Sequence, residues 1–148
     1  MQRPLLMLLR IVAVAHAALA IAQPLSIGQY LDGVIGALAW HGGTGEILAG
    51  TALLMSVLAL LVVLRRGPRW LVVPPLTLAL AEGLQIGLGF SRSLGVHIPL
   101  GVGIVATAIG YAIAVLRPSA ATQRSRRADR RPERPAADRH PDTEAAAG

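Results

Sequence analysis

Hydrophobic residues in this chain form long blocks rather than a helical or an alternating period. Four blocks reach the roughly 20 residues that a helix needs to cross a hydrocarbon core about 30 Å thick. The blocks predict helices over residues 5–23, 38–64, 70–89 and 96–116. The sequence therefore predicts an all-α fold, a four-helix transmembrane bundle within residues 1–117, followed by a tail at 118–148.

Proline and arginine mark most of the expected helix ends. Gln23-Pro24 is expected to end the first helix, because proline lacks the N–H that a helix interior needs. An Arg-rich turn at 65–69 ends the second helix, and Arg117-Pro118 ends the fourth. Pro74-Pro75 falls in the first turn of the third helix, where proline costs little.

Residues 26–46 are amphiphilic and rich in glycine, so two interpretations stay open. They extend the second helix toward its N-terminus, starting near Leu38, or they form an interfacial loop that carries Trp40 at the level of the lipid headgroups. We favour the extension.

The N-terminus also has features of a secretory signal peptide. Arg3 precedes an apolar stretch with A-x-A-like sequences at 15–17 and 18–20. Arg10, inside that stretch, argues against cleavage. If residues 1–22 were removed, His16 would leave the mature protein with them.

Arginine is distributed unevenly between the two ends of the predicted bundle. One end carries only Arg92, and the other carries Arg3, Arg65, Arg66, Arg69, Arg117 and the tail. Because positive loops stay cytoplasmic, both termini are expected inside. A composition rich in Ala, Gly, Pro and Arg with no Lys indicates a GC-rich bacterial genome, and hence a multi-pass protein of a bacterial cytoplasmic membrane.

The C-terminal tail has a different composition from the blocks before it. Residues 121–148 contain no aliphatic side chain larger than Ala, so they are expected to be disordered and cytoplasmic. Seven arginines at 124–139 favour contact with anionic lipid headgroups. Nucleic acid is not expected as a partner, because the tail has no aromatic residue to stack on bases.

Ionisable and amide side chains gather in the outer half of the expected bundle. His16, Glu46, Glu82 and His97 fall on four different helices at comparable depth, and Gln85 lies near them. Such residues normally face the bundle interior and pair with one another. Two interpretations follow. The residues form a structural cluster, for example with Glu82 bonded to His16, or they bind a ligand. If the ligand is a metal, the candidate residues are His16, Glu46 and Glu82.

Glycines offer two further hypotheses. Gly83 and Gly87 form a G-x-x-x-G motif, which favours close helix packing, within one chain or between the chains of a homo-oligomer. Gly45 and Gly101 each follow a histidine by four residues, so bare backbone could leave room for a flat ligand between two histidines.

Three segments resemble those of small haem-binding membrane bundles, the b-type cytochromes and the halves of haem A synthase. They are the sequences His41-Gly42-Gly43-Thr44-Gly45, Gln85-Ile86-Gly87-Leu88-Gly89-Phe90 and His97-Ile98-Pro99-Leu100-Gly101. The blocks as a whole also resemble short four-span actinobacterial membrane proteins of unassigned function. The haem resemblance implies His41 and His97 as axial ligands of one haem b and Arg92 as a partner for a propionate. With one histidine per helix and no acidic synthase motif, neither a second haem nor synthase activity is expected.

Three interpretations of function therefore remain. The chain binds one haem b near the outer face for electron transfer or haem handling, it is a proton- or metal-coupled membrane component, or it is a cofactor-free accessory protein. The absence of cysteine excludes thiolate ligands, and no hydrolase or nucleotide-binding motif is present, so an enzyme is not the favoured interpretation.

Overall fold

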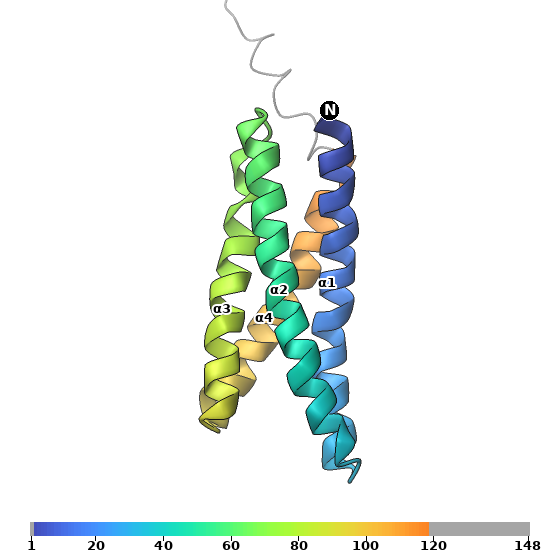
Figure 1. The fold of residues 1–148 in the computed structure, drawn as a ribbon, viewed down its shortest axis with the longest axis vertical. Coiled ribbons are helices and arrows are strands. Elements are labelled where there is room, and N and C mark those ends of the chain that lie inside the picture. Colours follow the sequence, from blue (N-terminus) through green and yellow to red (C-terminus); the bar gives the residue numbers. More distant parts are fainter. Residues whose placement is uncertain (1, 119–148) are drawn as a thin grey trace, which may run out of the picture.

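A computed structural model describes residues 2–118 of the chain, and the predicted disordered tail lies outside this range. The helices are α1 (Gln2–Leu31), α2 (Gly36–Leu64), α3 (Val73–Phe90) and α4 (Leu94–Leu116), with a short 3-10 turn, η1 (Arg69–Leu71), before α3. They run alternately up and down, and each of α1 and α3 packs against both α2 and α4 (Figure 1). The predicted four-helix bundle is confirmed.

All four helices are long and apolar enough to cross a membrane. Large apolar side chains also cover the outside, among them Leu80 at 71% and Val102 at 67% exposure. Such a surface suits lipid rather than water. The chain is a multi-pass membrane protein, and both ends of its described part lie at the same end of the bundle (Figure 1).

The predicted end of the first helix at Pro24 is wrong, because α1 continues through this proline to Leu31. Pro24 is exposed, and the Ser26 hydroxyl donates to the Gln23 carbonyl at 2.8 Å. Because Pro24 has no N–H, Ala20 O loses its usual helix partner, and α1 continues with one backbone bond fewer. The second helix begins at Gly36, so the extension is confirmed and the loop interpretation is wrong for residues 36–46.

Three helices end in the same hydrogen-bonded turn. After α2, Arg66 N donates to Val63 O and Gly67 N donates to Val62 O, and matching bonds close α1 and α3. The motif places one residue after each helix at positive φ, satisfying carbonyls that the helix leaves free. These residues are Gly33 (96°), Arg66 (71°) and Arg92 (54°).

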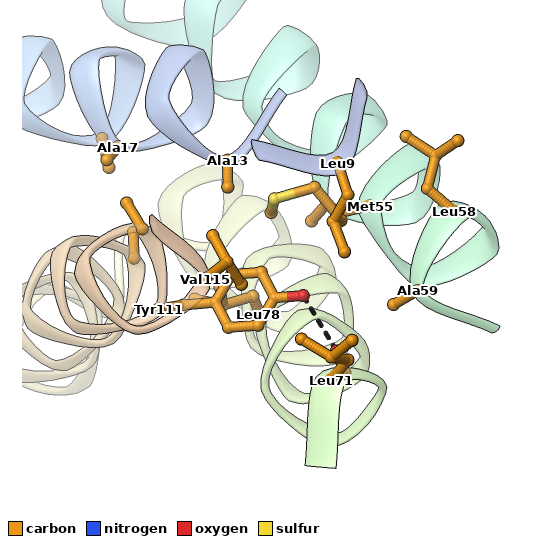
Figure 2. Close-up of a cluster of buried hydrophobic side chains, with 14 of the residues drawn as sticks. Leu9, Ala13, Ala17, Met55, Leu58, Ala59, Leu71, Leu78, Tyr111 and Val115 are labelled. Atoms are coloured by element: carbon orange, nitrogen blue, oxygen red, sulfur yellow. Dashed lines mark hydrogen bonds between the residues drawn. The ribbon is translucent and has the colours of Figure 1, made fainter. Parts of the chain in front are cut away.

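The bundle has two unlike halves along its length. We call the half next to Arg3, the 65–69 turn and Arg117 the arginine half, and the half next to the α1–α2 and α3–α4 turns the hairpin half. The arginine half has a continuous apolar core in which side chains from all four helices meet (Figure 2). Its most buried members include Leu9, Met55, Leu78 and Val115, each at 1% exposure or less.

Two polar side chains in the arginine half bond to backbone carbonyls at element ends. Arg10 Nε donates to Val115 O at 2.8 Å, in the last turn of α4. The Tyr111 hydroxyl donates to Leu71 O at 2.9 Å, at the end of η1 (Figure 2). Both carbonyls lie where the helix supplies no partner. Arg10 therefore acts in packing and remains outside the polar cluster, as expected.

Candidate cofactor site in the hairpin half

A cavity of about 370 Å³ lies in the hairpin half, between residues of all four helices. Its walls are mainly apolar, with Leu38, Phe90 and Leu94 near the turns and Leu48 and Ile104 at the deep end. Every polar residue singled out in the sequence except His16 and Arg92 lines it: His41, Glu46, Glu82, Gln85 and His97. The predicted gathering of polar groups in the outer half is thus present as the lining of one cavity.

His41 and His97 face each other across this cavity. Their ring centroids are 6.1 Å apart and the ring planes are inclined by 60°. His41 belongs to α2 and His97 to α4, two helices that lie diagonally across the bundle. The two histidines that the resemblance singled out therefore meet in space, although 55 residues separate them in sequence.

His97 is held in one tautomer by helix α3. Its Nδ1 lies 3.0 Å from Gln85 O, and a carbonyl can only accept, so Nδ1 carries the hydrogen. The Gln85 side chain returns a bond, with Nε2 donating to His97 O at 2.8 Å. Nε2 of His97 makes no hydrogen bond within residues 2–118, so its lone pair is free to bind a ligand.

His41 has a matching partner on α1. Its Nδ1 lies 3.3 Å from Gln23 O and 3.2 Å from Ser26 Oγ. With the Gln23 amide nitrogen toward α2, the amide donates to His41 O at 3.2 Å and accepts from Gly45 N at 3.3 Å. In this orientation Gln23 Nε2 lies 3.0 Å from His41 Nδ1, so Nδ1 accepts a hydrogen bond. In the opposite orientation the amide oxygen faces Nδ1, and Nδ1 donates. The orientation of Gln23 therefore sets the tautomer of His41.

The two hairpins repeat one arrangement, which we call the Gln–His clasp. In each hairpin, the backbone carbonyl of a glutamine on the first helix lies next to the Nδ1 of a histidine on the second. The side chain of the same glutamine lies beside a glycine that follows this histidine by four residues. The pairs are Gln23 with His41 and Gln85 with His97. Sequence reasoning missed Gln23, which it placed at a helix end; the histidine-glycine spacing shared by both hairpins was the available signal.

Gly101 makes room for a glutamine side chain, and both Gly45 and Gly101 also line the cavity, so the hypothesis that bare backbone leaves space for a flat ligand stays a prediction. A Cβ on Gly101 would lie 2.8 Å from Gln85 Nε2, and one on Gly45 would lie 3.7 Å from Gln23 Oε1. Gly89 is similarly close to the other clasp member, with a Cβ position 3.2 Å from the His97 ring. At Gly101 and Gly89 the clasp therefore fills the space that a side chain would need, whereas Gly45 has room for a Cβ.

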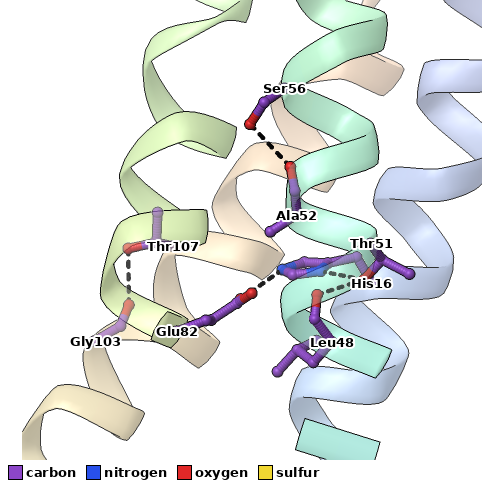
Figure 3. Close-up of polar contacts among 8 residues, drawn as sticks. All are labelled: His16, Leu48, Thr51, Ala52, Ser56, Glu82, Gly103 and Thr107. Atoms are coloured by element: carbon purple, nitrogen blue, oxygen red, sulfur yellow. Dashed lines mark hydrogen bonds and ion pairs between the residues drawn. The ribbon is translucent and has the colours of Figure 1, made fainter. Parts of the chain in front are cut away.

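At the deep end of the cavity, His16 and Glu82 form the pair that the sequence suggested (Figure 3). Their Nε2 and Oε1 atoms are 3.2 Å apart, and the side chains are 1% and 3% exposed. On its other side, His16 Nδ1 lies 2.9 Å from Thr51 Oγ1, which donates to Leu48 O at 2.7 Å. The pair is close but not aligned as a good hydrogen bond, and Glu82 Oε2 and Gln85 Oε1 also lack partners within residues 2–118.

The remaining predicted site residues are placed less centrally. Glu46 lines the cavity but makes no ion pair with another described residue, and no group of three or more potential metal-ligating side chains occurs within residues 2–118. Arg92 is exposed in the α3–α4 turn and is absent from the cavity lining. Gly83 and Gly87 face outward with open space around them, so this motif does not pack within the chain, and its role between chains stays a prediction.

Comparison of this chain with protein-family models, with curated proteins and with solved structures finds no match.

Proposed function

We propose that this protein binds one haem b in the hairpin half, with His41 and His97 as the axial ligands, and serves in electron transfer or haem handling at the outer face of a bacterial cytoplasmic membrane. The observation that carries the proposal is the 6.1 Å separation of the two ring centroids. Three further features support it: the orientation of the histidine rings, the apolar cavity between the helices, and the buried polar atoms beside it.

The separation agrees with the geometry of two imidazoles on opposite sides of one metal ion. A metal–nitrogen bond of about 2.0–2.1 Å plus about 1.1 Å from nitrogen to ring centre gives about 6.3 Å between the two centres. Two imidazoles are also a common axial donor set for haem iron, and a hydrogen bond from Nδ1 to a carbonyl is the usual way in which a protein orients such a ligand. His97 has this bond to Gln85 O, and His41 has the equivalent contact to Gln23 O when the Gln23 amide is oriented so that Nδ1 donates.

The cavity also supplies enclosed apolar space for part of a group of this class. About 370 Å³ lies within the range of sites that enclose small molecules. Apolar side chains such as Ile86, Ile104 and Val105 would exclude water from the bound group. Burial of this kind is one of the factors that set the reduction potential of a haem iron. When bound, haem would supply a one-electron centre; the chain's own residues would hold, orient and shield it, with Arg92 at the turn as the proposed partner of a propionate.

A purely structural role for the polar cluster is less well supported. That interpretation requires every buried polar atom to have a partner within the bundle, because an unpartnered one is costly in hydrocarbon. Glu82 Oε2 and Gln85 Oε1 are buried beside the cavity and have none among the described residues. Their position favours a bundle that is completed by something in the cavity.

The test is a reduced-minus-oxidised visible spectrum of the full chain, purified in detergent from a haem-replete host. We expect a Soret band and an α-band in the unmodified protein and in His140→Ala, a control that removes the fourth histidine. Both bands should be lost in His41→Ala and in His97→Ala. A pure protein without haem bands, or bands that survive both substitutions, would contradict the proposal.

A further inference from the structure

His16 and Glu82 take no part in the proposed haem ligation, and their hydrogen-bond partners define how many protons they hold. Thr51 has one hydroxyl hydrogen, which it donates to Leu48 O, so its oxygen accepts from His16 Nδ1. His16 Nε2 and Glu82 Oε1 are 3.2 Å apart, a contact that two lone pairs would oppose. A proton held between them would remove this repulsion and leave the pair neutral as a whole.

The second carboxyl oxygen of Glu82 is the open position of this pair. It is buried and has no hydrogen-bond partner within residues 2–118. Glu82 lines the cavity, so this oxygen lies next to a space that continues toward Phe90 and Leu94, which are 82% and 54% exposed at the turns. A proton arriving from the hairpin end therefore has both a route and an acceptor.

No comparable route leads to the arginine end. Toward that end the pair meets the apolar core, where Ala13, Met55, Leu78 and Ala108 are each at most 1% exposed. Polar side chains toward that end, among them Ser56, Arg10 and Tyr111, are bonded to backbone carbonyls. Core packing of this density leaves no space for a chain of water molecules.

We infer that His16 and Glu82 form a proton-binding site that exchanges with the hairpin side of the membrane and is closed to the arginine side. An added proton binds at Glu82 Oε2 while the proton already present stays with His16, which takes the pair from neutral to a charge of +1. Release of the added proton restores the neutral pair. No electron transfer is needed, so this inference is independent of haem.

The other titratable groups facing the cavity set the field around this site. They are His41 and Glu46 on α2 and His97 on α4, and α1 contributes no titratable group to the lining. Glu46 is exposed and lies five residues before Thr51 on the same helix. A carboxylate in this place would attract a proton entering from the hairpin end and favour a positively charged pair.

The first test is infrared difference spectroscopy of the purified full chain across a pH series, in H₂O and D₂O. Among the bands of the chain's eight acidic side chains, we expect one carboxylic-acid C=O band that changes with pH, shifts in D₂O and depends on Glu82. The band should be lost in Glu82→Gln, kept in Glu46→Gln, and shifted but kept in Thr51→Val. It should also be kept in a His41→Ala/His97→Ala double variant, so failure of the haem proposal would leave this result unchanged.

The second test measures access with thiol chemistry, because the chain has no cysteine of its own. Ile104→Cys and Ala108→Cys are a matched pair, one turn apart on the same buried face of α4, but only Ile104 lines the cavity. A charged, membrane-impermeant thiol reagent reacts with the thiolate and so needs water at the site. Added from the hairpin side, it should label Ile104→Cys at least 10-fold faster than Ala108→Cys.

Two results would overturn the inference. One is the absence, at every pH, of an acid band that depends on Glu82, even though the unmodified chain is folded. The other is labelling of Ala108→Cys as fast as Ile104→Cys, or labelling of either from the arginine side, since the apolar core would then not close the site.

Discussion

The arginine half and the hairpin half are built from the same four helices, but the first has a packed apolar core and the second encloses a cavity. In the arginine half, Met55 and Leu78 are buried by neighbours from other helices, and the few polar groups bond to helix-end carbonyls. In the hairpin half, the helices enclose a cavity whose lining includes carboxyl and imidazole groups. The difference indicates that the first half holds the bundle together, which allows the second to leave space and polar groups unfilled.

The largest effect should come from removing volume in the arginine half. Met55→Ala deletes a fully buried side chain, and we expect a loss of about 2–5 kcal/mol in the free energy of unfolding. Ile86→Ala, at the cavity wall, should cost much less, because Ile86 already borders empty space. Unfolding titrations with a denaturing detergent in mixed micelles measure both. Equal costs would show that the two halves contribute equally to stability.

A smaller effect should follow from disturbing one Gln–His clasp. The Cβ of Gly101→Ala would meet Gln85 Nε2 at 2.8 Å, which forces the amide away from His97 O. We expect a loss of about 1–3 kcal/mol, because a buried donor and acceptor lose their partner. Gly103→Ala is the matched control, with open space at its Cβ position. If both variants unfold at the same detergent concentration, the clasp does not depend on Gly101.

Tyr111→Phe tests the polar bonds that secure the arginine half. It removes the hydroxyl that donates to Leu71 O and leaves the ring in place. Hydrogen bonds in membrane proteins average about 0.6 kcal/mol and reach about 1.7, and we expect a loss in this range, since Leu71 is fully buried. Tyr30→Phe, on an exposed residue near the α1–α2 turn, should leave the unfolding curve unchanged. An unchanged curve for Tyr111→Phe would mean that Leu71 O finds another donor.

The smallest effect concerns the arginines at positive φ. Arg92→Gly and Arg66→Gly should each stabilise the bundle by up to about 1 kcal/mol, because a side chain in the left-handed region is strained. If Arg92 also contacts a haem propionate, Arg92→Gly alone should weaken haem binding while keeping this gain. Thermal unfolding and haem titration of the two variants separate the effects. Equal haem affinity would remove Arg92 from the proposed site.

Much of the fold could be predicted from the sequence, because an apolar block of about 20 residues is stable in lipid as a helix, which satisfies its own backbone polar groups. The helix ends were less predictable. Pro24 is expected to end a helix, yet α1 continues past it and packs along α2. Gly36 begins α2 without a capping side chain to mark it.

The candidate site was predictable in part. The depth of His16 and Glu82 along separate helices was enough to suggest their pairing, which the 3.2 Å contact confirms. The clasp could not be found in this way, because it depends on how far each helix is rotated about its axis. Residue spacing gives depth, but rotation is set by packing among all four helices, which no single segment encodes.

The Gln–His clasps have a consequence for how the site is built. Each clasp closes within one hairpin, through contacts 18 residues apart in the first and 12 in the second. In the α1–α2 hairpin, the contacts at His41 Nδ1 come from Gln23 and Ser26 and involve no residue of α3 or α4. Each histidine is therefore oriented by its own hairpin, and packing of the two hairpins against each other brings His41 and His97 face to face.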